Sequence, residues 1–267
     1  AKKEDIKIKT GKNVNIIAIS AKNLKKKRSF RINKKIFYKN PLDIARNPNV
    51  NIIFELIGLS DGISKKVVET SLRNKKHVIT ANKALIAKNG DFLSIIAEKN
   101  KVNLEFEAAV GGGIPILRTI KDGLATNKIN KVVGILNGTC NYILSEMESL
   151  KDTFSNVLKR AQSLGYAESN PKYDLNGYDT LAKVRILSAL AFNNKISKNK
   201  CLMDGIEDIE LEDIAMAKKL NFKIKLLGIT EIINNKLFER VHPCLTKNST
   251  YIANINGVMN AVILDGK

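Results

Sequence analysis

The first 110 residues alternate between strand-like and helix-like segments, and this alternation constrains the fold more than any other sequence feature. Residues 51–58 (NIIFELIG) form a continuous apolar run of strand length, which is typical of a strand covered on both faces. Residues 77–83 and 102–110 are predicted to be two further strands, each preceded by a helix-like segment. Strands joined through helices by short links form a parallel sheet with right-handed crossovers. We therefore predict a parallel α/β sheet, to which residues 13–21 add one more short strand.

Polar residues follow the carboxyl ends of these predicted strands, where open parallel sheets bind their cofactors. Gly58 ends the first strand, Asn82 and Lys83 end the second, and Glu107 lies near the end of the third. Gly58, Asn82 and Lys83 are therefore candidate cofactor-binding residues. A lysine at a helix start is commonly just a surface residue, but the helix dipole repels a cation there, which makes Lys83 a candidate for function.

The pattern changes after three consecutive glycines that end at Gly113. The second half mixes helices and strands in a less regular order, which indicates an α+β domain joined to the first near Gly113. Its predicted helices are 116–125, 141–149, 153–163 and 211–220, and its predicted strands are 128–139, 222–233 and 253–264. In the first half, a short helix is predicted over 41–46 and a long helix over 84–100. The long helix is expected to break at Asn89-Gly90.

The segment from Gly165 to Phe192 carries the most informative polar pattern. Asp179 and Lys183 stand four residues apart, so they share one face of a predicted helix. The apolar residues that continue this face are Ala182, Ile186, Leu187 and Leu190, whereas Thr180, Arg185 and Ser188 point elsewhere. A lysine on a buried stripe is rare unless it is paired, so the pair is a site candidate. The alternative is an ordinary ion pair at helical spacing, but acids also crowd the loop before it.

Two glycine-containing turns are weaker candidates for binding. EAAVGGGIP (107–115) reads by default as a tight turn, and its functional interpretation is a set of carbonyls gathered around Glu107, as hard cations require. GILNGTCNY (134–142) reads as a strand, a turn and a helix start, where backbone amides suit a carboxylate, although hairpin-like turns use the same residues.

The composition favours a water-soluble globular protein, with 44% hydrophobic and 27% charged residues. No run reaches the ~20 apolar residues that a membrane helix needs, and the start of the chain does not resemble a secretory signal. The three cysteines are scattered, which fits a reducing cytoplasm. The net charge of +19 raises the alternative of a nucleic-acid-binding protein. Aromatic residues are only 6%, however, and the basic residues are spread out apart from a cluster at 22–35, an expected exposed connection.

Seven segments together resemble homoserine dehydrogenase in the order of that family. They are ANKALIA, FEAAVGGGIPI, GILNGTCNYIL, AQSLGYAE, DLNGYDTLAKVRILSALAF, IKLLG and INGVMNAV. The resemblance covers nearly the whole chain, and it implies the NAD(P)H-dependent interconversion of aspartate 4-semialdehyde and homoserine in threonine and methionine biosynthesis. It also implies a Rossmann-like domain and a homodimer formed through the second domain.

The resemblance implies roles for individual residues. Lys183 resembles the proton donor to the developing alkoxide, with Asp179 as its partner, and Lys83 resembles a lysine beside the nicotinamide and the substrate. Glu168 resembles the ligand of the substrate ammonium group. The residues expected around the same substrate are Gly138, Thr139, Tyr166 and Asp174. The residues expected to hold a monovalent cation, Na⁺ or K⁺, are Glu107 and the backbone carbonyls of Val110, Gly112 and Ile114.

The two ends of the chain depart from the family pattern. The family begins with a strand and a G-x-G-x-x-G turn, whereas this sequence starts where the family has reached its second strand. It stops at Lys267, before the family's glycine-rich return segment. We interpret the chain as an incomplete copy with a partial dinucleotide-binding domain (1–112), a catalytic and dimerisation domain (113–255) and the start of a return segment (256–267). The alternatives that stay open are a non-catalytic or regulatory paralogue and a basic nucleic-acid-binding protein.

Overall fold

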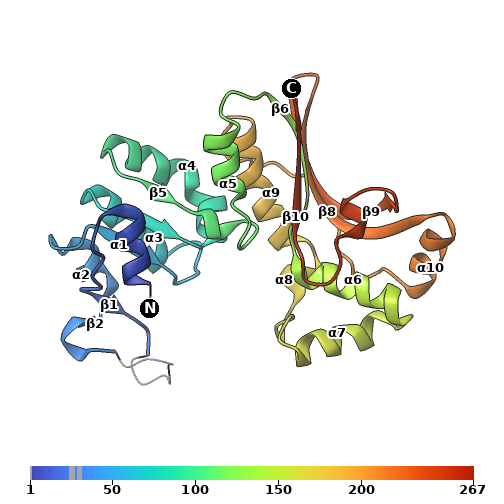
Figure 1. Cartoon of the computed structure of the whole chain (residues 1–267), viewed down its shortest axis with the longest axis horizontal. Coiled ribbons are helices and arrows are strands. Elements are labelled where there is room, and N and C mark those ends of the chain that lie inside the picture. Colours follow the sequence, from blue (N-terminus) through green and yellow to red (C-terminus); the bar gives the residue numbers. More distant parts are fainter. Residues whose placement is uncertain (1, 24–27, 29–31) are drawn as a thin grey trace. The chain divides into compact units, whose positions relative to one another are not determined.

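The structure is a computed structural model of the chain, and it describes residues 2–23, 28 and 32–267. Seven residues of the basic connection predicted over 22–35, namely 24–27 and 29–31, lie outside the described residues. The chain forms two compact units (Figure 1). One contains residues 1–80 and 92–105, and the other contains residues 81–91 and 106–267. Each unit is described by itself below.

The first unit is built around a three-stranded parallel sheet in the order β3-β4-β5. Its strands are β3 (Ile52–Glu55), β4 (His77–Thr80) and β5 (Leu104–Glu105), and both strand pairs are parallel, which confirms the predicted pairing. The connecting helices are α3 (Ile63–Arg73) and α4 (Lys83–Lys99). The remaining elements are α1 (Lys3–Thr10), β1 (Ile19–Ser20), η1 (Lys34–Ile36), β2 (Phe37–Tyr38) and α2 (Pro41–Arg46).

Three details of this unit differ from the sequence prediction. Only Ile19–Ser20 of the segment 13–21 forms a strand, paired in parallel with β2, and the helix α1 was not predicted. The strand β3 is not covered on both faces, because Ile53 is buried whereas Phe54 is 65% exposed. Helix α4 is continuous through Asn89-Gly90.

The glycine in α4 has a packing reason, which the sequence pattern did not reveal. A Cβ added at Gly90 would lie 2.7 Å from a side-chain methyl carbon of Ile196. The position is therefore occupied by glycine because a neighbouring segment packs closely on the helix, and the backbone stays helical.

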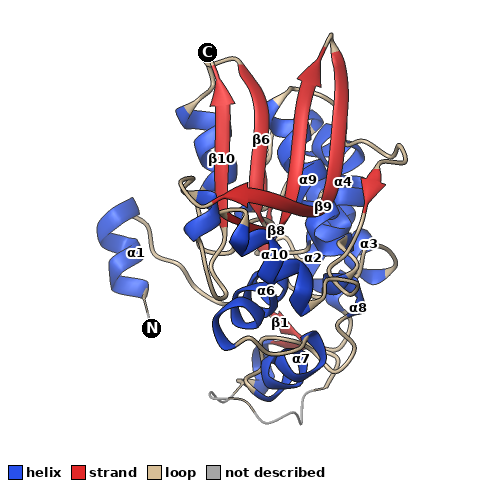
Figure 2. Cartoon of the chain, turned by 90° about the vertical axis from the view of Figure 1, so that its right-hand side faces the viewer, coloured by secondary structure: helices blue, strands red, loops and turns tan. Residues whose placement is uncertain are grey.

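The second unit is an α+β structure with a five-stranded sheet in the order β10-β6-β8-β9-β7. The strands are β6 (Ile129–Ile135), β7 (Leu202–Met203), β8 (Phe222–Ile233), β9 (Lys236–Lys247) and β10 (Ala261–Gly266). Figure 2 shows the long antiparallel strands side by side. The long strand β9 was missed by the sequence analysis, although Asn234 and Asn235, both with positive φ, form the two-residue turn that joins it to β8.

Helices and short turns complete this unit. They are η2 (Glu107–Ala109), α5 (Ile116–Arg118), the π-helical turn η3 (Thr119–Gly123), α6 (Gly138–Leu150), α7 (Phe154–Ser163), α8 (Lys172–Leu175), α9 (Tyr178–Ala191), α10 (Leu211–Lys219) and η4 (Ile252–Asn254). Helices α6, α9 and α10 contact β8. None of the helices in the described ranges is both long and apolar enough to cross a lipid bilayer.

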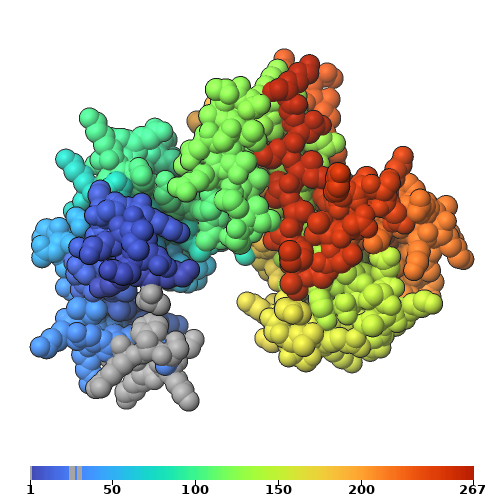
Figure 3. Space-filling model, in the orientation of Figure 1, coloured from blue at the N-terminus to red at the C-terminus, as the bar shows by residue number. Residues whose placement is uncertain are grey.

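The two compact units are not contiguous along the chain. Residues 81–91, which carry the start of α4, belong to the second unit. Residues 261–266 form an edge strand that pairs with β6. In the space-filling view, this red C-terminal segment lies directly beside green residues of the same unit (Figure 3). The antiparallel ladder with β6 satisfies the backbone groups along one side of this edge strand.

Candidate active site

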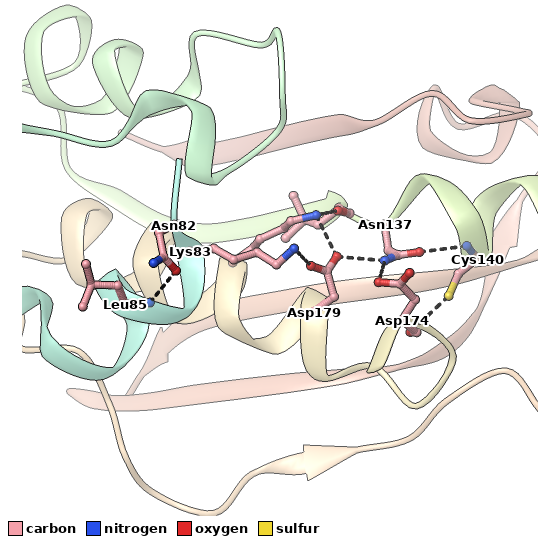
Figure 4. A network of polar contacts seen from close by, with 9 residues as sticks. Asn82, Lys83, Leu85, Asn137, Cys140, Asp174 and Asp179 are labelled. Atoms are coloured by element: carbon pink, nitrogen blue, oxygen red, sulfur yellow. Dashed lines mark hydrogen bonds and ion pairs between the residues drawn. The ribbon is translucent and has the colours of Figure 1, made fainter. Parts of the chain in front are cut away.

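Asp179, in the first turn of α9, is the centre of a polar cluster within the second unit. Its Oδ2 atom lies 2.7 Å from Nζ of Lys183, and its Oδ1 atom lies 2.5 Å from Nζ of Lys83 (Figure 4). The Asp179 side chain is only 2% exposed, the Lys183 side chain is 14% exposed and that of Lys83 is 35% exposed. A buried carboxylate held by two ammonium groups is a stronger functional signal than the solvated ion pair that helical spacing alone suggests.

Lys183 has a second partner at the end of β6. Its ammonium group donates a hydrogen bond of 2.5 Å to the backbone carbonyl of Leu136 in addition to its bond with Asp179. A lysine ammonium carries three N–H groups. Two of them are thus used by the described residues, and the third is the one that Lys183 can offer to a substrate oxygen.

Asn137 completes the cluster, and the sequence analysis did not select it. Its Oδ1 atom accepts a 2.8 Å hydrogen bond from the backbone N–H of Cys140 and so caps α6. Its Nδ2 atom donates to Oδ2 of Asp179 at 2.8 Å and to Oδ1 of Asp174 at 3.0 Å (Figure 4). An asparagine between a strand and a helix start is a recognisable capping signal. That signal identifies the cap, but not the two carboxylates beyond it.

Burial and neighbouring charges shift the pKa values of three groups in the cluster. Burial would raise the pKa of Asp179, but Lys183 and Lys83 outweigh burial and hold this pKa below the usual value. Burial would lower the pKa of Lys83, and the hydrogen bond and charge of Asp179 more than compensate, so the net pKa is raised. Burial and the nearby charge of Asp179 raise the pKa of Asp174, while the hydrogen bond from Asn137 opposes the increase. The formal charges of the two lysines and the two aspartates in this cluster cancel.

Close packing of α9 on the sheet places this cluster. A Cβ added at Gly228 of β8 would lie 2.3 Å from a methyl carbon of Val184 and 2.9 Å from one of Thr180, so only glycine lets the helix lie this close. Ser188 accepts a hydrogen bond from Thr230 of β8. The prediction that Thr180 and Ser188 point away from the buried face of α9 is therefore wrong, because the helix is buried on more than one side.

Several residues expected around the substrate lie at the start of α6. The hydroxyl of Thr139 donates a 2.6 Å hydrogen bond to the backbone carbonyl of Tyr166, which ties the loop before α8 to α6. Gly138 packs against the loop before β10, because a Cβ there would lie 2.8 Å from the carbonyl oxygen of Val258. The residue Glu168 is exposed, and within the described ranges its carboxylate makes no hydrogen bond or ion pair with the Asp179 cluster.

Comparison with known proteins identifies the family. A model of the homoserine dehydrogenase family matches residues 115–267, and a model of the homoserine dehydrogenase NAD binding domain matches residues 3–107. This chain belongs to the homoserine dehydrogenase family. The match does not favour the alternative of a basic nucleic-acid-binding protein.

Individual homoserine dehydrogenases agree with this assignment. The enzyme from Neisseria gonorrhoeae is 44% identical over 85% of this chain, and the match spans 52% of that relative. The crystal structure of a homoserine dehydrogenase from Thiobacillus denitrificans has a TM-score of 0.92 and 39% identity, and it covers 98% of this chain and 61% of that one. The S. aureus homoserine dehydrogenase at pH 6.0 has a TM-score of 0.86 and 36% identity, and it covers 99% of this chain and 66% of that one. The chain thus spans about half the length of the curated relatives that it matches.

The residues that we assigned to the cofactor of a homoserine dehydrogenase lie in both units. Asn82 caps α4, because its Oδ1 atom accepts a hydrogen bond from the backbone N–H of Leu85 (Figure 4). Gly58 follows β3 with a φ of +90° in the first unit, and the amides of Ile57 and Gly58 donate to a carboxylate oxygen of Glu55. Among the described residues, and apart from Gly58 and its two chain neighbours, no heavy atom lies within 4 Å of a Cβ added at Gly58. The open backbone turn at the carboxyl end of a parallel strand suits the close approach of a nucleotide cofactor.

Glu107 already has protein partners at the expected cation site. Its two carboxylate oxygens accept 2.9 Å hydrogen bonds from the backbone N–H groups of Leu117 and Arg118, so it caps the helical segment that begins with α5. The turn after it contains Gly111 and Gly112, both with positive φ, and the carbonyl of Ile114 accepts a hydrogen bond from Ile116. The described ranges contain no cluster of three or more histidine, cysteine or acidic side chains with metal-binding geometry. A cation beside Glu107 would be coordinated mainly by backbone carbonyl oxygens.

Proposed function

We propose that the protein to which this chain belongs is a homoserine dehydrogenase that reduces aspartate 4-semialdehyde to homoserine and catalyses the reverse reaction. The observation that carries the proposal is the buried carboxylate of Asp179, which holds the ammonium groups of Lys183 and Lys83 within a chain of this family. A non-catalytic paralogue is the weaker alternative, because such a protein would have no reason to retain two lysines on one buried carboxylate.

The cluster can supply the proton that carbonyl reduction requires. A bound nicotinamide cofactor supplies the hydride, and the carbonyl oxygen of the substrate then gains negative charge. Lys183 is held by Asp179 and by the carbonyl of Leu136, so its remaining N–H can stabilise that oxygen and protonate it. In the reverse direction the neutral amine of Lys183 accepts the hydroxyl proton. After each reduction the neutral amine of Lys183 regains a proton from solvent, which restores the proton donor.

The other expected residues are proposed to bind the substrate and cofactor. Glu168, as an exposed carboxylate, would bind the ammonium group of the substrate, with Thr139 and Gly138 at the start of α6 beside it. Tyr166 and Asp174 would complete the same pocket. On the cofactor side, we propose that Lys83, Asn82 and Gly58 contact NAD or NADP, in keeping with the family's NAD binding domain over residues 3–107.

Further properties follow from the family and stay proposals for this protein. We infer a homodimer formed through the second unit, a cytoplasmic location and a monovalent cation, Na⁺ or K⁺, held by Glu107 and the carbonyls of Val110, Gly112 and Ile114. We also infer that the basic surface does not bind nucleic acid. Sedimentation as a monomer at micromolar concentration would contradict the dimer, and steeply salt-dependent retention on DNA would contradict the last inference.

The activity can be tested in a protein that spans the full length of its relatives. Such a protein should oxidise the reduced nicotinamide when aspartate 4-semialdehyde is added. It should turn over succinate semialdehyde far more slowly, because this control aldehyde lacks the ammonium group that Glu168 is proposed to bind. A folded protein that binds NADPH but shows no turnover of aspartate 4-semialdehyde or homoserine would refute the proposed function.

A further inference from the structure

We propose that Asn137 is a positioning residue of the active site, which holds the carboxylates of Asp174 and Asp179 side by side and thereby keeps Lys183 aligned for proton transfer. The inference rests on the proposed function of the Lys183 and Asp179 pair. Asn137 is 6% exposed, and its amide nitrogen is within hydrogen-bond distance of both carboxylates (Figure 4).

The orientation of the Asn137 amide is determined by the helix that it caps. Because the backbone N–H of Cys140 donates to Oδ1, this end of the amide must be the acceptor oxygen. The Nδ2 end therefore faces the acids, and its two N–H groups match the two carboxylate oxygens that it contacts. No other side chain of this size both accepts from a helix terminus and donates to two anions.

Two consecutive residues at the end of β6 hold both members of the catalytic pair. The carbonyl of Leu136 accepts from the Lys183 ammonium, and the side chain of Asn137 donates to the Asp179 carboxylate. One rigid peptide unit joins the Leu136 carbonyl to the Cα atom of Asn137, and the cap bond from Cys140 holds the side chain beyond it. A shift of the Asn137 side chain would therefore move Asp179 relative to the carbonyl that orients Lys183.

Asn137 also separates two like charges. Asp174 and Asp179 repel each other, and the groups that face them are Lys83, Lys183, Tyr173 and Asn137. Both lysines bond to Asp179, whereas the hydrogen bond that the Asp174 carboxylate receives from a described side chain is the one from Asn137. If an acceptor replaced the N–H groups of Asn137, its oxygen atoms would lie beside the carboxylates of Asp174 and Asp179. The pKa values of both aspartates would then rise.

The decisive variant is Asn137→Asp, which keeps the shape and the oxygen that caps α6 but removes both N–H donors. The expected result is a fall in kcat on the order of 10- to 100-fold, because misplacement of a catalytic group has effects of this size. The KM for the nicotinamide cofactor should stay unchanged, and the acid limb of the kcat profile should move to higher pH. Asn137→Ser, which also retains the cap oxygen but is too short to reach the carboxylates, serves as a second variant.

Asn40→Asp is the matched control. Asn40 caps α2 through a hydrogen bond from the backbone N–H of Leu42, and its Nδ2 atom lies 3.4 Å from a carboxylate oxygen of Asp43. The same chemical change therefore occurs beside the same kind of neighbour, but at an exposed position in the other unit. This control should leave kcat and its pH profile unchanged.

The outcomes separate this inference from the proposed function. If the full-length protein is active and folded Asn137→Asp and Asn137→Ser variants keep its kcat and pH profile, the positioning role is overturned. If the unmodified protein shows no turnover, the proposed function fails, and titration of ¹³C-labelled aspartates by NMR then decides about Asn137. A higher pKa for Asp174 in the variants supports the positioning role, and an unchanged pKa overturns it.

Discussion

Replacing Lys183 by methionine removes the ammonium group but keeps most of the side-chain volume. The structure predicts a large effect on catalysis, because this Nζ atom lies 2.7 Å from Asp179 and 2.5 Å from the Leu136 carbonyl in a cluster that is largely buried. Removal of a general acid typically costs 10²- to 10⁴-fold, which corresponds to about 3–5 kcal/mol in the activation free energy of turnover. The KM for the cofactor should change little, because the lost interaction belongs to the transition state.

The same substitution should affect stability less than activity. Removing one partner of a buried ion pair costs about 3–5 kcal/mol when the other charge is left alone. Here Lys83 and Asn137 still hold the Asp179 carboxylate, so we expect a loss of about 1–3 kcal/mol in the free energy of unfolding. The contribution of Asp179 to stability is present above its unfolded pKa and is lost as pH falls through its lowered folded pKa. In the variant the folded pKa rises, so this acid loss should begin at a higher pH.

Steady-state kinetics of the full-length protein, together with thermal unfolding, measure both effects. Lys183→Arg should not restore activity, because a guanidinium keeps its proton and has a different shape. Lys159→Met, at an exposed position of α7, is the control for the loss of a lysine and should behave like the unmodified protein. Asp179→Asn should impair turnover non-additively with Lys183→Met, because the two groups act as one unit. A folded Lys183→Met variant with near-normal kcat would mean that Lys183 is a structural partner only.

Two other substitutions test different parts of the structure. Glu107→Gln has one acceptor oxygen for the two N–H groups of Leu117 and Arg118, so thermal unfolding should show a loss of about 0.5–2 kcal/mol. The activity of the full-length variant should also depend less on Na⁺ or K⁺, and unchanged salt activation would count against the cation site. Lys225 is buried on β8, and burial, with the charge of Lys223, lowers its pKa to about 8. Between pH 8 and 10.5 the unfolded chain binds this proton and the folded chain does not. The free energy of unfolding of the unmodified protein, relative to that of Lys225→Met, should therefore rise with pH. A difference that stays constant with pH in denaturant titrations would contradict this expectation.

Local patterns in the sequence determined many of the secondary-structure elements. Apolar runs of strand length predicted β3 and β4, and their pairing is parallel as expected. Helical spacing placed Asp179 and Lys183 on one face of α9, and the two side chains are indeed paired. These features depend on residues within one or two turns of one another, so their signals lie within a short window.

Other features depended on contacts between segments that are distant in the chain. Asn137 bonds to Asp179 across 42 residues, and Lys183 bonds to the Leu136 carbonyl across 47. Lys83 reaches the same carboxylate from the start of α4, which the sequence analysis had assigned to the other domain.

The sequence therefore identified the charged groups of the site, and the tertiary structure decided their arrangement. Nothing in the sequence spacing of Asn137 distinguishes a helix cap from a residue that also joins two acids. That second role exists only because α9 packs closely over Gly228 and brings Asp179 beside the end of β6. A buried charge needs partners on every side, and these partners come from whichever elements the packing brings together.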